Sequence, residues 1–370
     1  MRGGKSHATH WRPTEPCLLP DLTLLNAVLL FVAIALAAWL AGFALRRVLV
    51  ATGVMDRPRA HSSHDRPVPR GGGLLVVIAF FGWYFFGDHG AHPGLDFLAV
   101  GVAAVAIVSF LDDIRSRSRR LRFFVYTIAA AAFVWQLFRI DAISAWEPAW
   151  LVAFLLWLWI AGYANAFNFI DGIDGLAATQ AIGALGFGAA FCAMVPDNPG
   201  ARDLVALQLV LGGAMTGFLA HNLPRARMFL GDVGSIATGF LMASIAVLAA
   251  IEIDLRTGIC LAALHLGPVL DTALTLPRRL LQGKNPADRH REFFFHRAVR
   301  SGLSHQQVAA MELGIQLFGA AVLFGVRLSN DASLALGLAV GGIVAIWLAF
   351  FAFCESRYRR ISTGRESTHA

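Results

Sequence analysis

The sequence predicts an all-α polytopic membrane protein with about eleven transmembrane helices, and two observations support this fold class. Only 15% of the 370 residues are charged and 57% are hydrophobic, whereas soluble domains carry about 25% charged residues. The apolar residues also form long runs, such as 27–45, 235–251 and 333–353. A helix needs about 20 apolar residues to cross the hydrocarbon core, so these runs are typical of membrane spans.

The expected spans form one transmembrane catalytic domain that covers residues 23–354. They lie near 23–45, 72–87, 95–111, 122–139, 149–166, 175–195, 204–221, 234–251, 257–276, 308–326 and 333–354. Residues 1–22 are expected to be a short tail outside the cytoplasm, without the pattern of a cleaved signal peptide. Residues 355–370 are expected to be a cytoplasmic tail. The four cysteines form no CxxC pair, so neither a disulfide framework nor a zinc site is expected.

The basic residues predict the orientation of these spans. Most of the 31 Lys and Arg residues fall in alternate loops, at 46–70, 115–122, 225–227 and 278–300, and in the tail after 354. Arginine-rich short loops face the cytoplasm, which predicts an outer N-terminus and an inner C-terminus. This distribution also favours a membrane interpretation of the net charge of +7 over nucleic-acid binding. We expect a multi-pass protein of the cell inner (cytoplasmic) membrane.

Polar clusters interrupt the apolar pattern, and the predicted topology places all of them on the cytoplasmic face. They read SFLDDIRSRSRRLR at 109–122, NAFNFIDGIDGLA at 165–177, RMFLGDVGS at 227–235 and NPADRHREFFFHRAVRSGLSH at 285–305, with DRPRAHSSHDRPVPRGGGL at 56–74. A single Asp in such a segment could simply cap a helix. Ionisable groups at membrane depth are costly and usually functional, so five acids on one face favour a catalytic groove.

The residue types in these clusters indicate phosphate chemistry. Carboxylate and amide oxygens are the ligands that Mg²⁺ or Mn²⁺ prefers. Arginine and histidine complement the anionic oxygens of phosphates. Together they predict chemistry on a diphosphate in a groove at the cytoplasmic face, where electrostatic stabilisation of phosphoryl transfer needs these groups.

The order of these motifs resembles that of the polyprenyl-phosphate N-acetylhexosamine-1-phosphate transferase family. The matching segments are 63–73, 111–113, 165–176 and 229–235, within roughly two thirds of the chain. The resemblance implies transfer of an N-acetylamino-sugar 1-phosphate from a UDP-sugar to undecaprenyl phosphate, which gives a polyprenyl-diphosphate sugar and UMP and requires Mg²⁺ or Mn²⁺. It is nearest to the branch that initiates O-antigen or other envelope glycans. Membrane lipids surround such proteins, a homodimer is compatible with the resemblance, and nucleic acid is not an expected partner.

The resemblance also implies a role for each candidate residue. Asp232 and Asn168 match metal ligands. The expected catalytic residues are Asp112 and Asp113 for the lipid phosphate, with Asp112 favoured as proton acceptor, Asp171 and Asp174 for the nucleotide, and His290. The expected substrate contacts are His64, Arg66, Arg70, Asn165, Phe229, Arg291 and His296. Phe229 matches an aromatic that stacks on uracil, although a lipid-facing residue is an equal alternative, and a solvated basic loop is the alternative for His64, Arg66 and Arg70.

One segment departs from the common pattern of the family. Many members carry a His-x-His-His cluster where this chain reads Phe-Phe-Phe-His at 293–296. His290 and Arg291 are therefore the first choice for contacts to the diphosphate, and His296 is the second. The departure disfavours the muramoyl-pentapeptide substrate and leaves N-acetylated glucosamine, fucosamine and quinovosamine open.

Two other classes of protein are weighed against the transferase. An intramembrane aspartyl protease would share the Gly231-Asp232 pair but needs a second Asp deep in a neighbouring span. A transporter would place its ionisable groups near the bilayer midplane. The acids of this chain crowd one membrane edge beside Asn and Arg, which favours the transferase.

Overall fold

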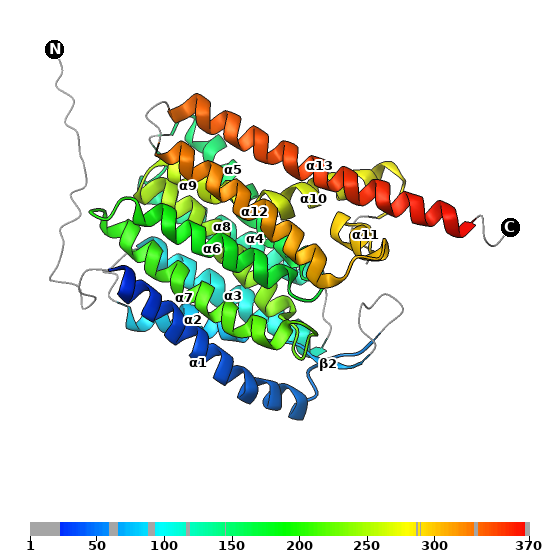
Figure 1. Cartoon of the computed structure of the whole chain (residues 1–370). Coiled ribbons are helices and arrows are strands. Elements are labelled where there is room, and N and C mark those ends of the chain that lie inside the picture. The colour runs from blue at the N-terminus through cyan, green and yellow to red at the C-terminus, as the bar shows by residue number, and fades with distance from the viewer. Residues whose placement is uncertain are drawn as a thin grey trace, which may run out of the picture.

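The computed structural model describes residues 23–58, 66–87, 93–115, 119–144, 146–285, 288, 290–328 and 332–366. In these ranges almost every element is a helix (Figure 1), apart from an antiparallel ribbon in which β1 (Met55–Asp56) pairs with β2 (Val68–Pro69). His64 and the expected tail at 1–22 lie outside the described residues.

The apolar helices follow the expected spans one for one. Among the described residues, nine are long and apolar enough to cross a membrane: α1 (Leu24–Ala51), α3 (Pro93–Arg115), α4 (Arg119–Arg139), α5 (Ala149–Ile170), α6 (Leu176–Ala193), α7 (Pro199–Asn222), α8 (Gly231–Glu252), α12 (His305–Arg327) and α13 (Ala332–Glu366). The bent pair α9 (Leu255–Ala263) and α10 (Leu266–Leu281) qualifies as a tenth, and α2 (Leu74–Phe86) is a shorter apolar helix. The all-α membrane fold class is confirmed, while the orientation and a count of eleven spans stay predictions.

The break between α9 and α10 was not expected, because the sequence pattern predicts one span over 257–276. The two helices meet at an angle of 62°. Pro268 has no N–H to donate to the carbonyl of Leu264 four residues earlier. Gln316 of α12 donates to that carbonyl instead, at 3.0 Å, so the bend keeps its backbone oxygen paired inside the bundle.

Helix α8 lies at the centre of the bundle and places its first turn at the candidate site. In an apolar 18-residue stretch of α8, 89% of the residues are buried, whereas the share is 11% in the peripheral helix α1. Helix α8 packs against α3, α5 and α9. A helix that is apolar all round is a buried helix. The exposed side chains of α1, such as Leu36 and Leu40, are suited to contact with lipid.

The segment after β2 is fastened to the start of α8. The amides of Gly71 and Gly72 donate to the Phe229 carbonyl at 3.2 and 2.8 Å, and the Gly73 amide donates to the Leu230 carbonyl at 2.8 Å. The two backbones approach so closely that a Cβ on Gly73 would lie 1.9 Å from the Cα of Gly234. This contact fixes residue 70, which follows β2, beside the N-terminus of α8.

The C-terminal helix extends beyond the expected end of the last span. Helix α13 continues without a break to Glu366 (Figure 1), past the boundary at residue 354. The short helix α11 (Phe294–Arg300) packs against this extension.

Candidate active site

Five charged side chains from four parts of the chain meet at one end of the bundle. Asp112 and Asp113 lie in the last turns of α3, Arg122 in the first turn of α4, Asp232 in the first turn of α8, and Arg70 directly after β2. We call this set the acid–arginine cluster. Its members come from the ends of elements that run in alternating directions, which confirms that these motifs share one face of the bundle.

Asp232 is the centre of the acid–arginine cluster. Its Oδ1 lies 2.6 Å from Nη2 of Arg70, and its Oδ2 pairs with Nη1 of Arg122. Arg70 also reaches Asp113, with 2.8 Å between Nε and Oδ1. Arg122 also reaches Asp112, with 2.8 Å between Nη1 and Oδ2. The side chains of Asp112 and Asp232 are only 8% and 12% exposed, so the charges are paired as burial requires.

Asp113 has a structural task in addition to its pairing with Arg70. Its carboxylate accepts hydrogen bonds from the amides of Asp232 and Val233, at 3.1 and 3.0 Å. These are orphan donors of the first turn of α8, and a negative charge is favourable at that end of a helix. The preceding Gly231 has φ +78°, a conformation that favours glycine. A Cβ at this position would lie 2.8 Å from Oδ2 of Asp113, so the absence of a side chain lets the carboxylate reach the amides of α8.

Asp112 differs from its neighbour because one of its oxygens is available. Oδ1 of Asp112 is buried and accepts no hydrogen bond within the part of the chain that the structure describes. Buried polar atoms are nearly always satisfied. An unpartnered carboxylate oxygen beside the Arg122 guanidinium is therefore suited to a proton, a cation or a substrate group.

The acid–arginine cluster has the donor chemistry of a hard-cation site. Three carboxylates against two guanidiniums leave an excess of negative charge, and Mg²⁺ commonly uses one or two protein carboxylates. Asn168 lies beside it, since Ser235 of α8 donates to its Oδ1 at 2.6 Å. No group of three or more His, Cys, Asp and Glu side chains in the described ranges is arranged as a metal site, and both oxygens of the Asp232 carboxylate pair with arginines.

Asp171 borders the acid–arginine cluster on the loop between α5 and α6. Burial raises the pKa of this carboxyl to about 8 although its side chain is partly exposed, while the Arg70 guanidinium and the Gly231 amide act in the opposite direction. Asp113 and Asp174 raise the pKa further. Burial therefore favours the neutral acid form of Asp171.

Asp174 is fixed by contacts on two sides of the same loop. Its Oδ2 accepts from the Ala226 amide at 3.2 Å, and its own amide donates to Nδ1 of His305 at 3.2 Å. The loop is held further by Asn222, whose Oδ1 accepts from the Gly175 amide at 2.6 Å. The start of α12 thus belongs to the candidate site.

The Phe-rich segment forms an aromatic stack that carries the two candidate histidines. Phe293 lies between Phe169 and Phe295, with ring centroids 5.0 and 5.7 Å away. His290 packs on Phe293 at 4.8 Å, and His296 packs on Phe295 at 4.1 Å. The departure from the common family pattern therefore builds an apolar support for the histidines.

His296 lies against the loop at 171–175. A Cβ on Gly172 would lie 2.9 Å from Nε2 of His296. Burial, helped by neighbouring arginines, lowers the pKa of His290 to about 4 and that of His296 to about 3. Both rings are neutral near pH 7, so each can contact a phosphate through a hydrogen bond rather than through a positive charge.

The remaining candidates have more distant or different surroundings. Asn165 accepts a hydrogen bond from the Tyr126 hydroxyl at 3.0 Å, which joins α4 to α5. The backbone of Phe229 holds the segment after β2, and its ring is half-buried. Arg66 is exposed and Arg291 is half-buried. The structure brings Arg70, both metal candidates and the four aspartates that are expected to be catalytic together, but it does not place Arg66 or Asn165 in the acid–arginine cluster.

Sequence reasoning missed Arg122, Ser235 and His305 as site residues. Arg122 belongs to an arginine-rich run, in which every member resembles a topology signal. A signal did exist: only three residues separate α3 from α4, so residue 122, three residues into α4, returns to the level of residue 112, three residues before the end of α3. The hairpin spacing therefore predicts the contact.

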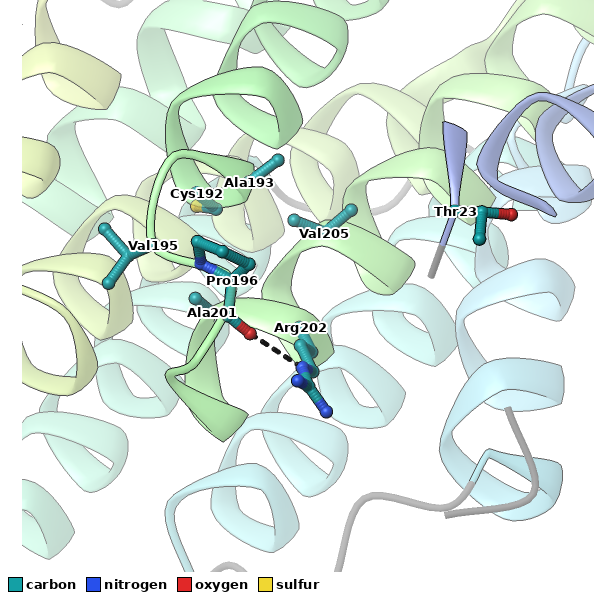
Figure 2. Close-up of a pocket in the computed structure, with 8 residues that line it drawn as sticks. All are labelled: Thr23, Cys192, Ala193, Val195, Pro196, Ala201, Arg202 and Val205. Carbon is teal, nitrogen blue, oxygen red and sulfur yellow. Dashed lines mark hydrogen bonds between the residues drawn. The ribbon is translucent and has the colours of Figure 1, made fainter. Parts of the chain in front are cut away.

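A pocket of about 210 Å³ lies at the opposite end of α6 and α7 (Figure 2). It is lined by Thr23, Cys192, Ala193, Val195, Pro196, Ala201, Arg202 and Val205. Arg202 Nε donates to the Pro196 carbonyl at 2.8 Å, as Figure 2 shows. None of the candidate site residues lines this pocket.

The fold is that of a polytopic membrane protein with an acid–arginine cluster at one end of its bundle, and comparison with known proteins identifies its family. Residues 96–250 match the family described as Glycosyl transferase family 4. A putative glycosyltransferase of Streptomyces coelicolor is 32% identical over 344 residues, which cover 87% of this chain and 75% of the relative. The chain therefore belongs to the polyprenyl-phosphate N-acetylhexosamine-1-phosphate transferase family and is a phospho-sugar transferase.

Two further relatives have more specific names. A probable undecaprenyl-phosphate N-acetylglucosaminyl 1-phosphate transferase of Bacillus subtilis is 26% identical over 339 residues, covering 90% of this chain and 93% of the relative. A decaprenyl-phosphate N-acetylglucosaminephosphotransferase of Mycobacterium tuberculosis is 26% identical over 351 residues, covering 84% and 86%.

Proposed function

We propose that this protein transfers an N-acetylamino-sugar 1-phosphate from a UDP-sugar to undecaprenyl phosphate, releasing UMP. The observation that carries the proposal is the acid–arginine cluster at one end of the bundle, because it combines phosphate-binding guanidiniums with carboxylates at the membrane edge. The relatives are named for N-acetylglucosamine and for undecaprenyl or decaprenyl phosphate, which makes UDP-N-acetylglucosamine the first donor to test.

The two arginines are proposed to bind the diphosphate of the donor. Guanidiniums form paired, charge-assisted hydrogen bonds to phosphate oxygens. Arg70 and Arg122 now hold Asp232, so an incoming diphosphate would compete with that carboxylate. Its release from the arginines would make Asp232 available for a cation.

Mg²⁺ or Mn²⁺ is proposed to be held by Asp232 and Asn168, which lie near one another at the first turn of α8. When bound, the ion would neutralise charge on the diphosphate. Asp113 is not proposed as a ligand, because the α8 amides and Arg70 use its oxygens.

In the proposed reaction an oxygen of the lipid phosphate forms a bond to the phosphorus that carries the sugar. The bond from that phosphorus to the UMP oxygen breaks, and UMP leaves. A phosphate monoester has a second pKa of about 6, so much of the acceptor is already a dianion at pH 7. Asp112 is proposed to accept the remaining proton and to position the acceptor.

The nucleotide is proposed to lie against the loop at 171–175, with Asp174 at the uracil edge. His296 and Arg291 are proposed to contact the diphosphate from α11 and the residues before it, with the neutral His290 behind them. We propose that this face is cytoplasmic, because UDP-sugars are made there, and that the product initiates O-antigen, lipopolysaccharide or another envelope glycan in the inner membrane.

The rival functions are not favoured. An aspartyl protease uses two carboxylates that share a proton, whereas Asp112 and Asp232 are each ion-paired with Arg122. Family membership also disfavours a transporter.

The test is an assay of membranes that contain the protein, with undecaprenyl phosphate, Mg²⁺ and a panel of UDP-N-acetylamino sugars. We expect one donor to give a lipid-linked diphosphate sugar identified by mass spectrometry. Asp232→Ala should abolish the product, while Asp197→Ala, an exposed Asp at the opposite end, should retain it. Absence of product with every donor, with either Mg²⁺ or Mn²⁺, would overturn the proposal.

A further inference from the structure

The short helix α11 is held from two sides by carboxylates of other helices. On one side, the Phe294 amide donates to both carboxylate oxygens of Asp271 in α10, each 3.0 Å from the amide nitrogen. On the other side, Arg297 of α11 pairs with Glu355 of α13. The ring of Phe294 also stacks on Phe351 of α13, with centroids 4.6 Å apart. The position of α11 therefore depends on the C-terminal helix.

Glu355 pairs with several arginines where α11 is attached to α13. Its Oε2 pairs with the Arg297 guanidinium and lies 3.6 Å from Nη1 of Arg278 in α10. Its Oε1 lies 2.7 Å from Nε of Arg359. Arg278 and Arg297 both donate to the Glu292 carbonyl, at 2.7 and 3.1 Å. Two guanidiniums on one carbonyl repel each other, so the Glu355 carboxylate offsets a local excess of positive charge.

The ion pairs of Glu355 with Arg297 and Arg278 are largely shielded from solvent. The Glu355 side chain is 20% exposed and that of Arg297 is 12% exposed, whereas Arg359 is 75% exposed. Exposed ion pairs contribute little to stability, so the inward pairs with Arg297 and Arg278 carry the attachment. The exposed pair with Arg359 involves the same carboxylate, so its removal can be compared with removal of the inward pairs.

Movement of α11 would be transmitted to the nucleotide side of the site. His296 lies in α11, and its Nε2 is 2.9 Å from where a Cβ of Gly172 would be. Phe295 of the same helix packs on His296 at 4.1 Å. The loop at 171–175 and α11 are thus in direct contact, while Glu355 itself touches neither this loop nor the acid–arginine cluster through any recorded contact.

We propose that Glu355 is a positioning residue for this site: it joins Arg278 and Arg297 so that α11 keeps His296 against the loop at 171–175. This proposal rests on the proposed function, because His296 is there assigned to the diphosphate of the UDP-sugar. Its consequence is that the extension of α13 controls binding of the donor without touching the donor.

The variants separate positioning from general stability. In Glu355→Gln the carboxylate charge is lost but the shape is kept, and Arg357 still donates to the Ser301 hydroxyl at 3.1 Å, so α11 stays attached more loosely. Glu355→Asp keeps the charge and should recover most of the effect. Arg359→Ala removes the exposed pair with Glu355 and is the matched control. Arg297→Gln removes the same inward pair from the α11 side.

The experiment measures hydrogen exchange and kinetics of the full chain in lipid nanodiscs. Loss of a charge-assisted hydrogen bond corresponds to about a tenfold change in an equilibrium. For Glu355→Gln and Arg297→Gln we expect amides 294–300 to exchange about tenfold faster relative to α8. We also expect the KM for the UDP-sugar to rise about tenfold, with kcat and the KM for undecaprenyl phosphate within about twofold. Arg359→Ala should change neither quantity.

Unchanged exchange of amides 294–300 in both Gln variants would overturn the positioning role. So would an equal loss of kcat in Glu355→Gln and Glu355→Asp. The exchange measurement does not need turnover, so it still decides the role of Glu355 if no donor in the panel yields product. Failure of the proposed function is thereby distinguishable from failure of this inference.

Discussion

Asp112 and Asp113 are adjacent in sequence, yet their surroundings give them different chemistry. Asp113 caps α8 and pairs with Arg70, so both of its oxygens are used. Asp112 pairs with Arg122 through one oxygen and leaves the other unpartnered among the described residues. A carboxylate with an available oxygen can take a proton or a cation at little cost to the fold, whereas loss of Asp113 would release the start of α8.

Arg122 should be as important as the aspartates that it contacts. We expect Arg122→Gln to lower kcat/KM about a hundredfold, because one preorganised electrostatic contact to a reacting group has about that value. Arg120→Gln is the matched control, since Arg120 is exposed in the same helical turn, and its activity should stay within about twofold of wild type. Steady-state kinetics with the preferred UDP-sugar measure both, and equal activities of the two variants would remove Arg122 from the site.

Asp171 should make the fold less stable as the pH rises. Its pKa is raised by burial from the ordinary 3.8 to about 8. A group whose pKa is higher in the folded state stabilises the fold fully below its unfolded-state pKa, and that contribution is lost as the pH rises to the folded-state value. The apparent melting temperature of wild type should therefore fall relative to Asp171→Asn from about pH 4 to pH 8 and then stay parallel. Thermal unfolding in detergent with a chelator measures this; parallel curves throughout would show that Asp171 is ionised in the fold.

At the scale of single residues, the sequence predicts which residue types form the site, but it does not predict which of their atoms form hydrogen bonds or ion pairs. The aspartates could be found because ionisable groups are conspicuous in apolar segments. Arg122 could not be separated from the neighbouring arginines by composition, since all of them satisfy the same topological rule. The difference between Asp112 and Asp113 depends on which carboxylate reaches the N-terminus of α8, and only the packing of α3 on α8 decides that.

The helices hold the site in place through close backbone contacts. The segment after β2 and the first turn of α8 touch at Gly73 and Gly234, where a Cβ on Gly73 would be 1.9 Å from a Cα. This contact places Arg70 between Asp113 and Asp232. Close approach of helices at small residues is the ordinary way in which membrane proteins pack.

Gly73→Ala should separate α2 from α8 and displace Arg70. Overpacking of a tight contact costs about 3 kcal/mol, so we expect a lower apparent melting temperature and a loss of activity. Gly82 lies within α2, where an added Cβ would have no neighbouring atom within 4 Å, so Gly82→Ala should be close to wild type. Thermal stability of both variants in detergent checks this, and equal stability would mean that the backbones can move apart freely.

The elements themselves were largely predictable, because long apolar runs leave few alternatives to helices in a membrane. Each expected segment contains a helix. The bend between α9 and α10 escaped prediction because it depends on Gln316, a distant residue that pairs with the carbonyl freed by Pro268. The continuation of α13 past residue 354 was missed because a charged, helical segment and an irregular tail have similar hydropathy.

At the scale of the whole molecule, the motifs gather at one end of the bundle, as expected from the alternation of basic loops. The side of the membrane that this end faces is still a prediction. A C-terminal fusion to green fluorescent protein should be fluorescent, and a fusion to alkaline phosphatase should be inactive, because the C-terminus is predicted to be cytoplasmic. Active phosphatase with a dark fluorescent fusion would reverse the orientation and place the site away from UDP-sugars.

The central claim is that the acid–arginine cluster moves a sugar together with its phosphate. The most direct measurement uses a UDP-N-acetylamino sugar that carries tritium in the sugar and radioactive phosphorus in the phosphate attached to it. We predict that both labels enter the lipid fraction in equal molar amounts, that UMP is released, and that Asp232→Ala blocks both. Transfer of tritium without the radioactive phosphate, with release of UDP, would contradict the account.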